Sequence, residues 1–368
     1  MRSRLLVPVS VLGPVVAPLL VLPLAGCPSS APGDDASAGT SAGATSTTAT
    51  STGSESDTGT TGDAASCPAQ APAELMDCVD RDRYQTDLEF ISDVRTPGSP
   101  HWQAVQDLCA DRLAELGYAV TLQDYGTGVN VLGARLGTTS PDEQVVVGAH
   151  YDHIAGCSGA DDNGSGVAAA LEVARVLAEV PTERTLVIAC WDEEELGLIG
   201  SKAHAAAAIA GDEAIVAVVD LDSMGYATDA PNSQSVPPGF DVVFADQYAE
   251  LVANEFRGDF LLWVGDESMK PYGDAMEVHA AAIGLPTIGT LLEDVIKNED
   301  IVADLRRSDH ASFWAVDIPA VFFNDTADFR YPYYHCYEGD DVVGEVNLDF
   351  AVKVTKVTAA TAGEALGL

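Results

Sequence analysis

Three largely apolar segments, 143–150, 184–191 and 214–221, set the strongest limit on how this chain can fold. Strands that are apolar along most of their length are buried on both faces, as in parallel sheets. Segments with helical periodicity, such as 165–180 and 196–210, alternate with them. This alternation predicts an α/β fold whose central sheet is covered by helices on both faces.

Each apolar segment also ends in ionisable residues. The first runs into His150 and Asp152, the second into the acids of 192–195, and the third into Asp220 and Asp222. Ligands of open α/β sheets bind beyond the carboxyl ends of the strands, so we expect these groups to gather at one edge of the sheet. Because they are His, Asp and Glu, they indicate a metal site at that edge.

A glycine-rich loop, GCSGADDNGSG at 156–166, lies between the first two apolar segments. Its four glycines and two aspartates are typical of a loop rather than of a core element. The sequence Asp-Asn-Gly at 162–164 fits a cap of the helix that follows. It also fits a site in which Asp162 points into a cleft and bridges two cations, and the residues alone leave both interpretations open.

The chain carries a net charge of −39 at pH 7. Proteins that bind nucleic acid need a basic surface, so this charge excludes that class of partner. A surplus of acids attracts cations and amine-bearing substrates, and it equally favours solubility in a salty habitat.

The first 66 residues predict export and tethering rather than a folded domain. Two arginines followed by a long apolar run indicate a signal peptide over 1–27. Its last residues, Leu-Ala-Gly-Cys, resemble the lipobox of bacterial lipoproteins, which implies cleavage before Cys27 and a lipid on that cysteine. Ser, Thr, Gly and Ala dominate 28–66, which predicts a flexible tether. We therefore expect a globular domain over 67–368, held at the cell envelope by the lipid alone. Pro28 stands where inner-membrane lipoproteins carry aspartate, so the outer membrane is favoured.

Six further cysteines permit three disulfides in an exported protein, and their pairing cannot be read from the sequence. Cys190 lies within an apolar segment, which is typical of a free buried thiol. No two cysteines have Cys-x-x-Cys spacing, so a cysteine-rich zinc site is not expected. The six are Cys67, Cys78, Cys109, Cys157, Cys190 and Cys336.

Six motifs with candidate ligands follow one another from His150 to about Asp341. In this order they resemble the di-zinc aminopeptidase and glutamate-carboxypeptidase family, which also contains the glutaminyl cyclases. The resemblance implies one catalytic domain over 67–368 with a mixed, mostly parallel sheet, two Zn²⁺ per chain and peptide substrates. The motifs are GAHYDH, GADDNGSG, EEELGLIGS, VDLDSMG, SDHASFW and YYHCYEGDD.

The same resemblance assigns five metal ligands, which are His150, Asp162, Glu195, Asp222 and His335. Asp162 bridges the two ions, and each ion then has one histidine and one further carboxylate. Zinc binds imidazole nitrogen and carboxylate oxygen at about 2.0–2.2 Å. A bridging anion offsets the repulsion between two ions that lie about 3.5–4 Å apart.

Three more residues receive catalytic roles from the resemblance. Glu194 is the general base, which takes a proton from water and delivers it to the leaving amine. Asp152 orients the imidazole of His150, and His310 helps to hold the oxyanion. Glu193 has no role in the family, and we expect its side chain to be solvated.

Residues around these motifs carry weaker expectations. His153 is expected at the surface, and a position next to the ligands or a role in specificity is the alternative. Cys157 and Cys336 flank the site, and we hypothesise that they form a disulfide that fixes the glycine-rich loop near His335. Asp161 and the acids in the 260s are the candidates to hold the α-amine of a substrate.

The favoured function is an exopeptidase that removes N-terminal residues. A glutaminyl-peptide cyclotransferase is an alternative, although such enzymes use one zinc and lack the full second set of ligands. A carboxypeptidase would need an arginine cluster, for which Arg306, Arg307 and Arg330 are candidates. A binding protein without catalysis is expected to have lost ligands, whereas every ligand position is occupied here.

Overall fold

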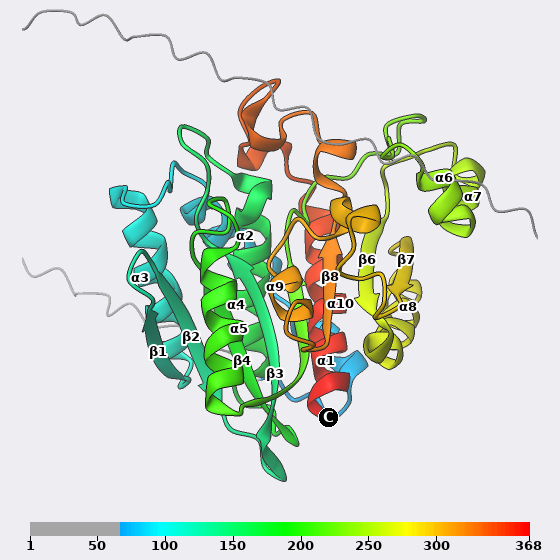
Figure 1. Cartoon of the computed structure of the whole chain (residues 1–368). Helices are drawn as coiled ribbons and strands as arrows, with labels where there is room; N and C mark the ends of the chain where they lie inside the picture. Colours follow the sequence, from blue (N-terminus) through cyan, green and yellow to red (C-terminus); the bar gives the residue numbers. More distant parts are fainter. Residues whose placement is uncertain (1–66) are drawn as a thin grey trace, which may run out of the picture. The chain divides into compact units, whose positions relative to one another are not determined.

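The computed structural model describes residues 67–368. The predicted signal peptide, lipobox and tether lie outside the described residues. Within 67–368, helices α1 to α3 and strands β1 to β3 come first, and from α4 to α10 helices and strands alternate, as Figure 1 shows in chain colours. None of these helices combines the length and the apolar character that a membrane-spanning helix needs.

Eight strands form one mixed sheet in the order β1-β2-β4-β3-β5-β8-β6-β7. The run β4-β3-β5-β8 is parallel and so is the pair β6-β7, whereas β1-β2, β2-β4 and β8-β6 are antiparallel. The predicted α/β class with a mixed, mostly parallel sheet is confirmed. The strands are β1 (Ala119–Asp124), β2 (Val129–Arg135), β3 (Ser140–His150), β4 (Arg184–Trp191), β5 (Ala214–Leu221), β6 (Leu261–Asp266), β7 (Thr287–Leu292) and β8 (Ala320–Asn324).

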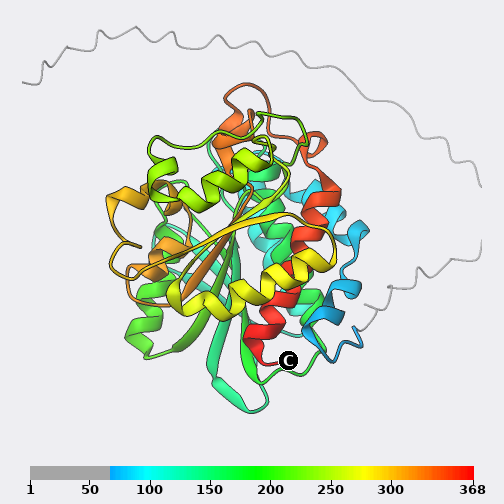
Figure 2. The same ribbon diagram turned by 90° about the vertical axis from the view of Figure 1, so that its right-hand side faces the viewer.

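Helices cover both faces of the sheet. Helices α1, α2, α3, α4, α8 and α10 pack on one face, where α8 and α10 lie side by side (Figure 2), and α5 and α9 pack on the other. In β3, Val145 and Val147 join the first core and Val146 joins the second, because successive side chains of a strand point to opposite faces. The helices are α1 (Pro72–Cys78), α2 (Arg81–Ile91), α3 (Pro100–Glu115), α4 (Gly166–Leu177), α5 (Ile199–Gly211), α6 (Phe240–Val243), α7 (Ala245–Ala253), α8 (Lys270–Ala282), α9 (His310–Trp314) and α10 (Leu348–Leu366).

The parallel register fixes the edge at which a site can form. His150 pairs with Trp191 across β3 and β4, and Gly148 pairs with Asp220 across β3 and β5. The polar residues that follow these three strands therefore emerge next to one another, as ligand sites of open α/β sheets require.

Candidate metal centre

All five side chains predicted to bind metal converge at this edge. His150 ends β3, Glu195 follows β4, and Asp222 follows β5. Asp162 comes from the glycine-rich loop, and His335 comes from the segment after β8. Four of the five side chains are almost completely withdrawn from solvent, and that of His335 is 21% exposed.

Asp162 lies between the two histidines. Its Oδ1 is 3.4 Å from Nε2 of His150, and its Oδ2 is 3.2 Å from Nε2 of His335. Nε2 of His150 is also 3.6 Å from Oδ1 of Asp222, and Nε2 of His335 is 3.3 Å from Oε2 of Glu195. Atoms about 2.0–2.2 Å from one tetrahedral ion lie roughly 3.3–3.6 Å from one another. Each set therefore has the spacing of side chains around a common cation.

The turn that presents Asp162 is held from two sides. The carboxylate of Asp341 accepts backbone N–H groups of Asp161 and Asp162 at 3.0 and 3.1 Å. The fully buried guanidinium of Arg95 donates to the carbonyl oxygens of Asp162 and Gly159, at 3.1 and 2.7 Å. Arg95 was not predicted from the sequence, because an arginine before Thr-Pro-Gly belongs to no ligand motif.

Asp152 holds three groups at once. Its carboxylate accepts the backbone N–H of Glu194 at 3.0 Å and that of Glu195 at 3.3 Å. Its Oδ1 lies 3.6 Å from Nδ1 of His150, and its backbone oxygen lies 3.2 Å from the same nitrogen. This placement fits the predicted orientation of the imidazole and adds a second role, which is to fix the backbone of the two glutamates.

Glu194 and Glu193 have different surroundings. Oε2 of Glu194 lies 3.9 Å from Nε2 of His150. Burial raises the pKa of Glu194 well above its usual range, and the nearby charge of Asp309 adds to the shift. The prediction of a solvated Glu193 is wrong, because its side chain is buried and accepts the hydroxyl proton of Thr127 at 2.6 Å.

The charges of the cluster compensate one another without a cation. Burial opposes charge on Asp162, but hydrogen bonds from His150 and His335 hold its pKa well below the usual range. Burial alone would lower the pKa of His335, but contacts with Asp162 and Glu195 raise it to about 10. The carboxylates around His150 likewise raise its pKa well above the ordinary value, against the effect of burial. Both imidazoles therefore carry protons that a metal ion must displace.

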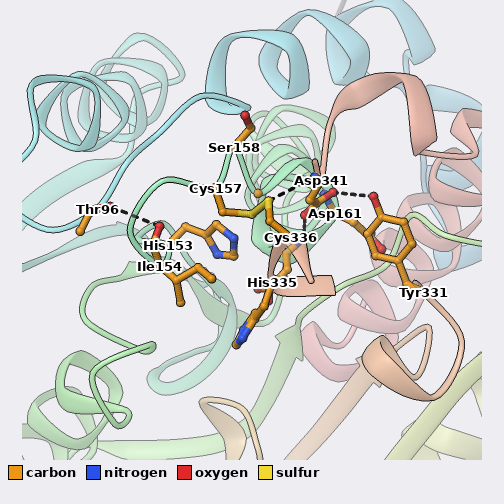
Figure 3. Close-up of a disulfide and its surroundings, with 12 residues drawn as sticks. Thr96, His153, Ile154, Cys157, Ser158, Asp161, Tyr331, His335, Cys336 and Asp341 are labelled. Carbon is orange, nitrogen blue, oxygen red and sulfur yellow. Dashed lines mark hydrogen bonds and ion pairs between the residues drawn. A yellow bond between two sulfur atoms is a disulfide. The ribbon is translucent and has the colours of Figure 1, made fainter. Parts of the chain in front are cut away.

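The position predicted for His153 is wrong. It was expected at the surface, but it is fully buried and its Nδ1 lies 2.8 Å from Oε1 of Glu195. Its ring meets the ring of His335 edge-on at 5.8 Å (Figure 3). The loop folds closely over it, since a Cβ on Gly159 would lie 2.6 Å from the His153 ring. His153, Asp162 and Glu195 also lie close enough together to hold a metal ion, in addition to the sets around His150 and His335.

The hypothesised disulfide between Cys157 and Cys336 is confirmed. It ties the glycine-rich loop to the residue after His335 (Figure 3). His335 and Cys336 both have positive φ, at 53° and 56°. Residues other than glycine need surrounding support in that conformation, and the cross-link supplies it. Cys190 is a free buried thiol as expected, Cys109 is also free, and Cys67 pairs with Cys78.

His310 lies within the fold instead of facing the candidate ligands. Its Nδ1 is 2.9 Å from Oδ2 of Asp220, and its Nε2 is 2.9 Å from the carbonyl oxygen of Leu305. The ring is fully buried and stacks on Phe322. Because both nitrogens are engaged, the predicted oxyanion contact does not fit this geometry, and His310 instead joins α9 to β5.

Asp161 also points away from the candidate ligands. Its side chain is buried, and Oδ1 accepts the backbone N–H of Gly225 at 2.6 Å. Burial and the neighbouring Asp325 raise the pKa of Asp161 well above its usual range. The suggested role in binding a substrate amine therefore does not fit its position.

The three candidate arginines do not form a carboxylate-binding cluster. Arg330 is buried and donates to backbone carbonyl oxygens. Arg306 lies 3.7 Å from Asp300, and Arg307 donates to Asp328 at 2.7 Å. Each guanidinium is therefore engaged with other groups of the protein.

Tyr334 was not singled out from the sequence, although it directly precedes His335. Its ring stacks on that of His335 at 4.0 Å, and its hydroxyl accepts a hydrogen bond from Arg307 at 3.2 Å. Burial raises the pKa of Tyr334 well above its usual value, so the phenol keeps its proton. It is therefore a neutral donor at the border of the candidate site.

Known proteins share both the sequence pattern and the fold. Peptidase family M28 matches residues 130–362. Protein YfbL of Escherichia coli strain K12, described as uncharacterized, is 30% identical over an alignment of 205 residues that covers 52% of this chain and 58% of YfbL. Aminopeptidase YwaD of Bacillus subtilis strain 168 is 41% identical over 76 residues, 20% of this chain and 17% of YwaD. The LapA aminopeptidase of Legionella pneumophila has a TM-score of 0.63 at 18% identity, covering 81% of this chain and 75% of LapA.

Proposed function

The chain belongs to peptidase family M28, and on this premise we propose that it is a zinc-dependent aminopeptidase, which removes N-terminal residues from peptides. The observation that carries the proposal is the cluster of five ligand side chains around the shared carboxylate of Asp162, with Glu194 close by. The relatives named aminopeptidase support the same activity, although the chain spans only 17% of YwaD and 58% of YfbL.

We propose two zinc ions, one held by His150, Asp162 and Asp222 and the other by Asp162, Glu195 and His335. The donor types suit zinc, and the spacings of 3.2 to 3.6 Å between donor atoms fit its tetrahedral coordination. When bound, such ions polarise the scissile carbonyl and acidify water.

Glu194 is the proposed general base. It takes a proton from the attacking water and then delivers it to the nitrogen of the leaving amine. A carboxylate whose pKa is raised by burial serves both steps, because its affinity for the proton lies nearer to that of its partners. Asp152 positions this base through its hydrogen bond to the Glu194 backbone.

Tyr334 takes the role that was predicted for His310. Its hydroxyl is oriented by Arg307 and keeps its own proton. It can therefore donate to the oxygen that becomes negative when the carbonyl carbon turns tetrahedral.

Neither alternative activity fits the geometry of the site as well as aminopeptidase action does. The cyclotransferase alternative predicts an incomplete second ligand set, whereas Glu195 and His335 are both in place. The carboxypeptidase alternative needs free arginines, whereas Arg307 and Arg330 are engaged.

The test compares aminoacyl-coumarin amides with an N-acetylated leucyl control on the zinc-loaded protein. Among the aminoacyl substrates, we expect release only from those with a free α-amine, and its loss on chelation. Glu194→Gln should lower kcat by about 10²–10⁴-fold, the contribution of a general base, while two zinc ions stay bound. Glu193→Gln is the matched control and should retain activity. Equal cleavage of the acetylated substrate, or full activity of Glu194→Gln, would contradict the proposal.

We also propose that the chain is exported and anchored by lipid on Cys27, with the outer membrane as its site. The support is the Leu-Ala-Gly-Cys sequence and the tether that follows it. Metabolic labelling with palmitate should mark the wild type and leave Cys27→Ser unlabelled. Equal labelling of both would refute the anchor.

A further inference from the structure

A cavity of about 450 Å³ opens beside the metal ligand Asp222. It lies at the same sheet edge as the ligands but over the other half, where β8, β6 and β7 meet it. Its walls come from segments 234–244 and 301–307, and its floor comes from the strands. Of the residues used in the proposed mechanism, Asp222, Arg307 and Tyr334 line it, so most of the cavity is unused by the chemistry described above.

The floor is a straight row of residues across four strands. Asp222 and Asn324 directly follow Leu221 and Phe323, the last paired residues of β5 and β8. Asn324 pairs with Leu262 on β6, and Leu262 pairs with Ile288 on β7. Asn324 also donates to the backbone oxygen of Asp222 at 2.7 Å, which closes the row at the metal end.

This row gives the cavity a length. Three spacings of about 4.8 Å between neighbouring strands separate Asp222 from Ile288, or about 14 Å. With carbon–carbon bonds of about 1.5 Å, a natural apolar side chain extends only about 6 Å from its Cα. The side chain of a substrate's first residue would therefore leave the half near Ile288 empty.

The far half is apolar. Leu251, Phe260 and Ile288 form a small core there, packed against Phe240 and Leu262. The charged residues that line the cavity, within residues 67–368, are Asp222 at the metal end and the exposed Asp304 and Arg307. The deep end thus has no charge to pair with a polar group, and it favours hydrocarbon.

The geometry points to a further activity, the hydrolysis of amides whose acyl group is an unbranched chain of about ten carbons. This inference rests on the proposed metal centre. The acyl carbonyl would lie at the ligands with its chain along the row, and an extended chain advances about 1.3 Å per carbon, so about ten carbons reach Ile288. Water adds its oxygen to the carbonyl carbon, the carbon–nitrogen bond breaks, and Glu194 passes the water proton to the nitrogen. The products are a fatty acid and a free amine.

The test is a series of straight-chain N-acyl aminocoumarins from acetyl to dodecanoyl, which share their leaving group with the aminopeptidase substrates. Each buried methylene should raise kcat/KM by about fourfold until the cavity is filled near ten carbons. The rise should then stop. If the acyl series is silent while leucyl-coumarin is cleaved, the inference is overturned and the aminopeptidase stands. If both are silent with two zinc ions bound, the proposed function fails as well.

Variants at the far end of the cavity test whether its length, and not apolar contact in general, sets the preferred length of the acyl chain. Ile288→Phe should shorten the preferred chain by about three carbons, since it fills the deep end, and leave leucyl-coumarin cleavage unchanged. Val236→Phe, on a loop of the wall, gives a second test that does not depend on the folding of a strand variant. Val278→Phe, at an exposed position on α8 outside the cavity, is the matched control. An unchanged chain-length profile in both cavity variants contradicts the inference.

Discussion

One edge of one sheet carries two opposite chemistries. Strands β3, β4 and β5 reach this edge with their carboxyl ends and deliver the histidine and the carboxylates of the metal centre. Strands β6 and β7 run the other way, so they reach the same edge with their first residues, among which Leu261, Leu262 and Ile288 are apolar. The reversal of strand direction between β8 and β6 thus separates a polar half, with the metal ligands that follow β3, β4 and β5, from an apolar half, the far end of the cavity over β6 and β7.

The largest effect should come from the shared ligand on the polar half. Asp162→Ala removes the carboxylate that faces both histidines, so neither ion set stays complete. We expect loss of bound zinc and a fall in kcat/KM of at least about 10⁴-fold, since base catalysis and electrostatic stabilisation are lost together. Zinc content by mass spectrometry and initial rates measure this. Retention of two zinc ions by the variant would show that Asp162 does not bridge.

The second largest effect should come from acid, which should weaken zinc binding at the polar half and leave ligand binding at the apolar half nearly unchanged. The raised pKa values of His150 and His335, the latter about 10, mean that both rings are protonated at neutral pH without zinc. Zinc displaces these protons, one for each ion, so the affinity for each ion falls as the pH falls, by up to about tenfold per pH unit. Competition with a coloured chelator between pH 6 and 8 measures the slope. Binding of decanol to the apolar cavity, followed by calorimetry, should change less than twofold over that range, and a parallel slope would argue against the division.

The disulfide that flanks the metal centre should contribute more to stability than the disulfide far from it. Cys157 and Cys336 are 179 residues apart, whereas Cys67 and Cys78 are 11 apart. In the chain-entropy account, the longer loop is worth about 5 kcal/mol and the shorter about 3 kcal/mol. Denaturant titrations of the two Cys→Ser double variants should therefore differ by about 2 kcal/mol. Equal losses would mean that the long cross-link does not restrict the unfolded chain as its span implies.

The smallest effect should come from the opening of the apolar half. Ile301 lines the cavity but is 65% exposed, so it covers a bound chain only in part. Ile301→Ser should lower kcat/KM for apolar substrates by about threefold, because less than one full side chain of apolar contact is lost. Val278→Ser, at a similarly exposed position on α8, should have no effect. A drop of equal size in both variants would point to a general surface effect.

The polar half was largely predictable from the sequence. Its ligands sit at strand ends or in a glycine-rich loop, and parallel register brings such positions together whatever the rest of the fold does. The exceptions depend on packing between distant segments. His153 is buried because the loop at Gly159 closes over it, and His310 turns inward because Asp220 offers it a partner. No local pattern encodes either contact.

The apolar half was not predicted. Its floor residues belong to short strands whose apolar side chains look like ordinary core, and its walls are loops without a motif. The row from Asp222 to Ile288 exists only because β6 enters antiparallel to β8, a pairing between strands about 60 residues apart in the sequence. Pairing of this kind depends on tertiary packing and not on local periodicity.

Asp152 grips the imidazole of one ligand and the backbone of both Glu194 and Glu195. When thermal motion displaces this carboxylate, the three groups that it holds are carried along together. Their mutual distances then vary less than their distances from the rest of the protein. Asp152 therefore couples the motions of these groups, so the general base and the ligands keep their relative positions when this edge of the sheet moves.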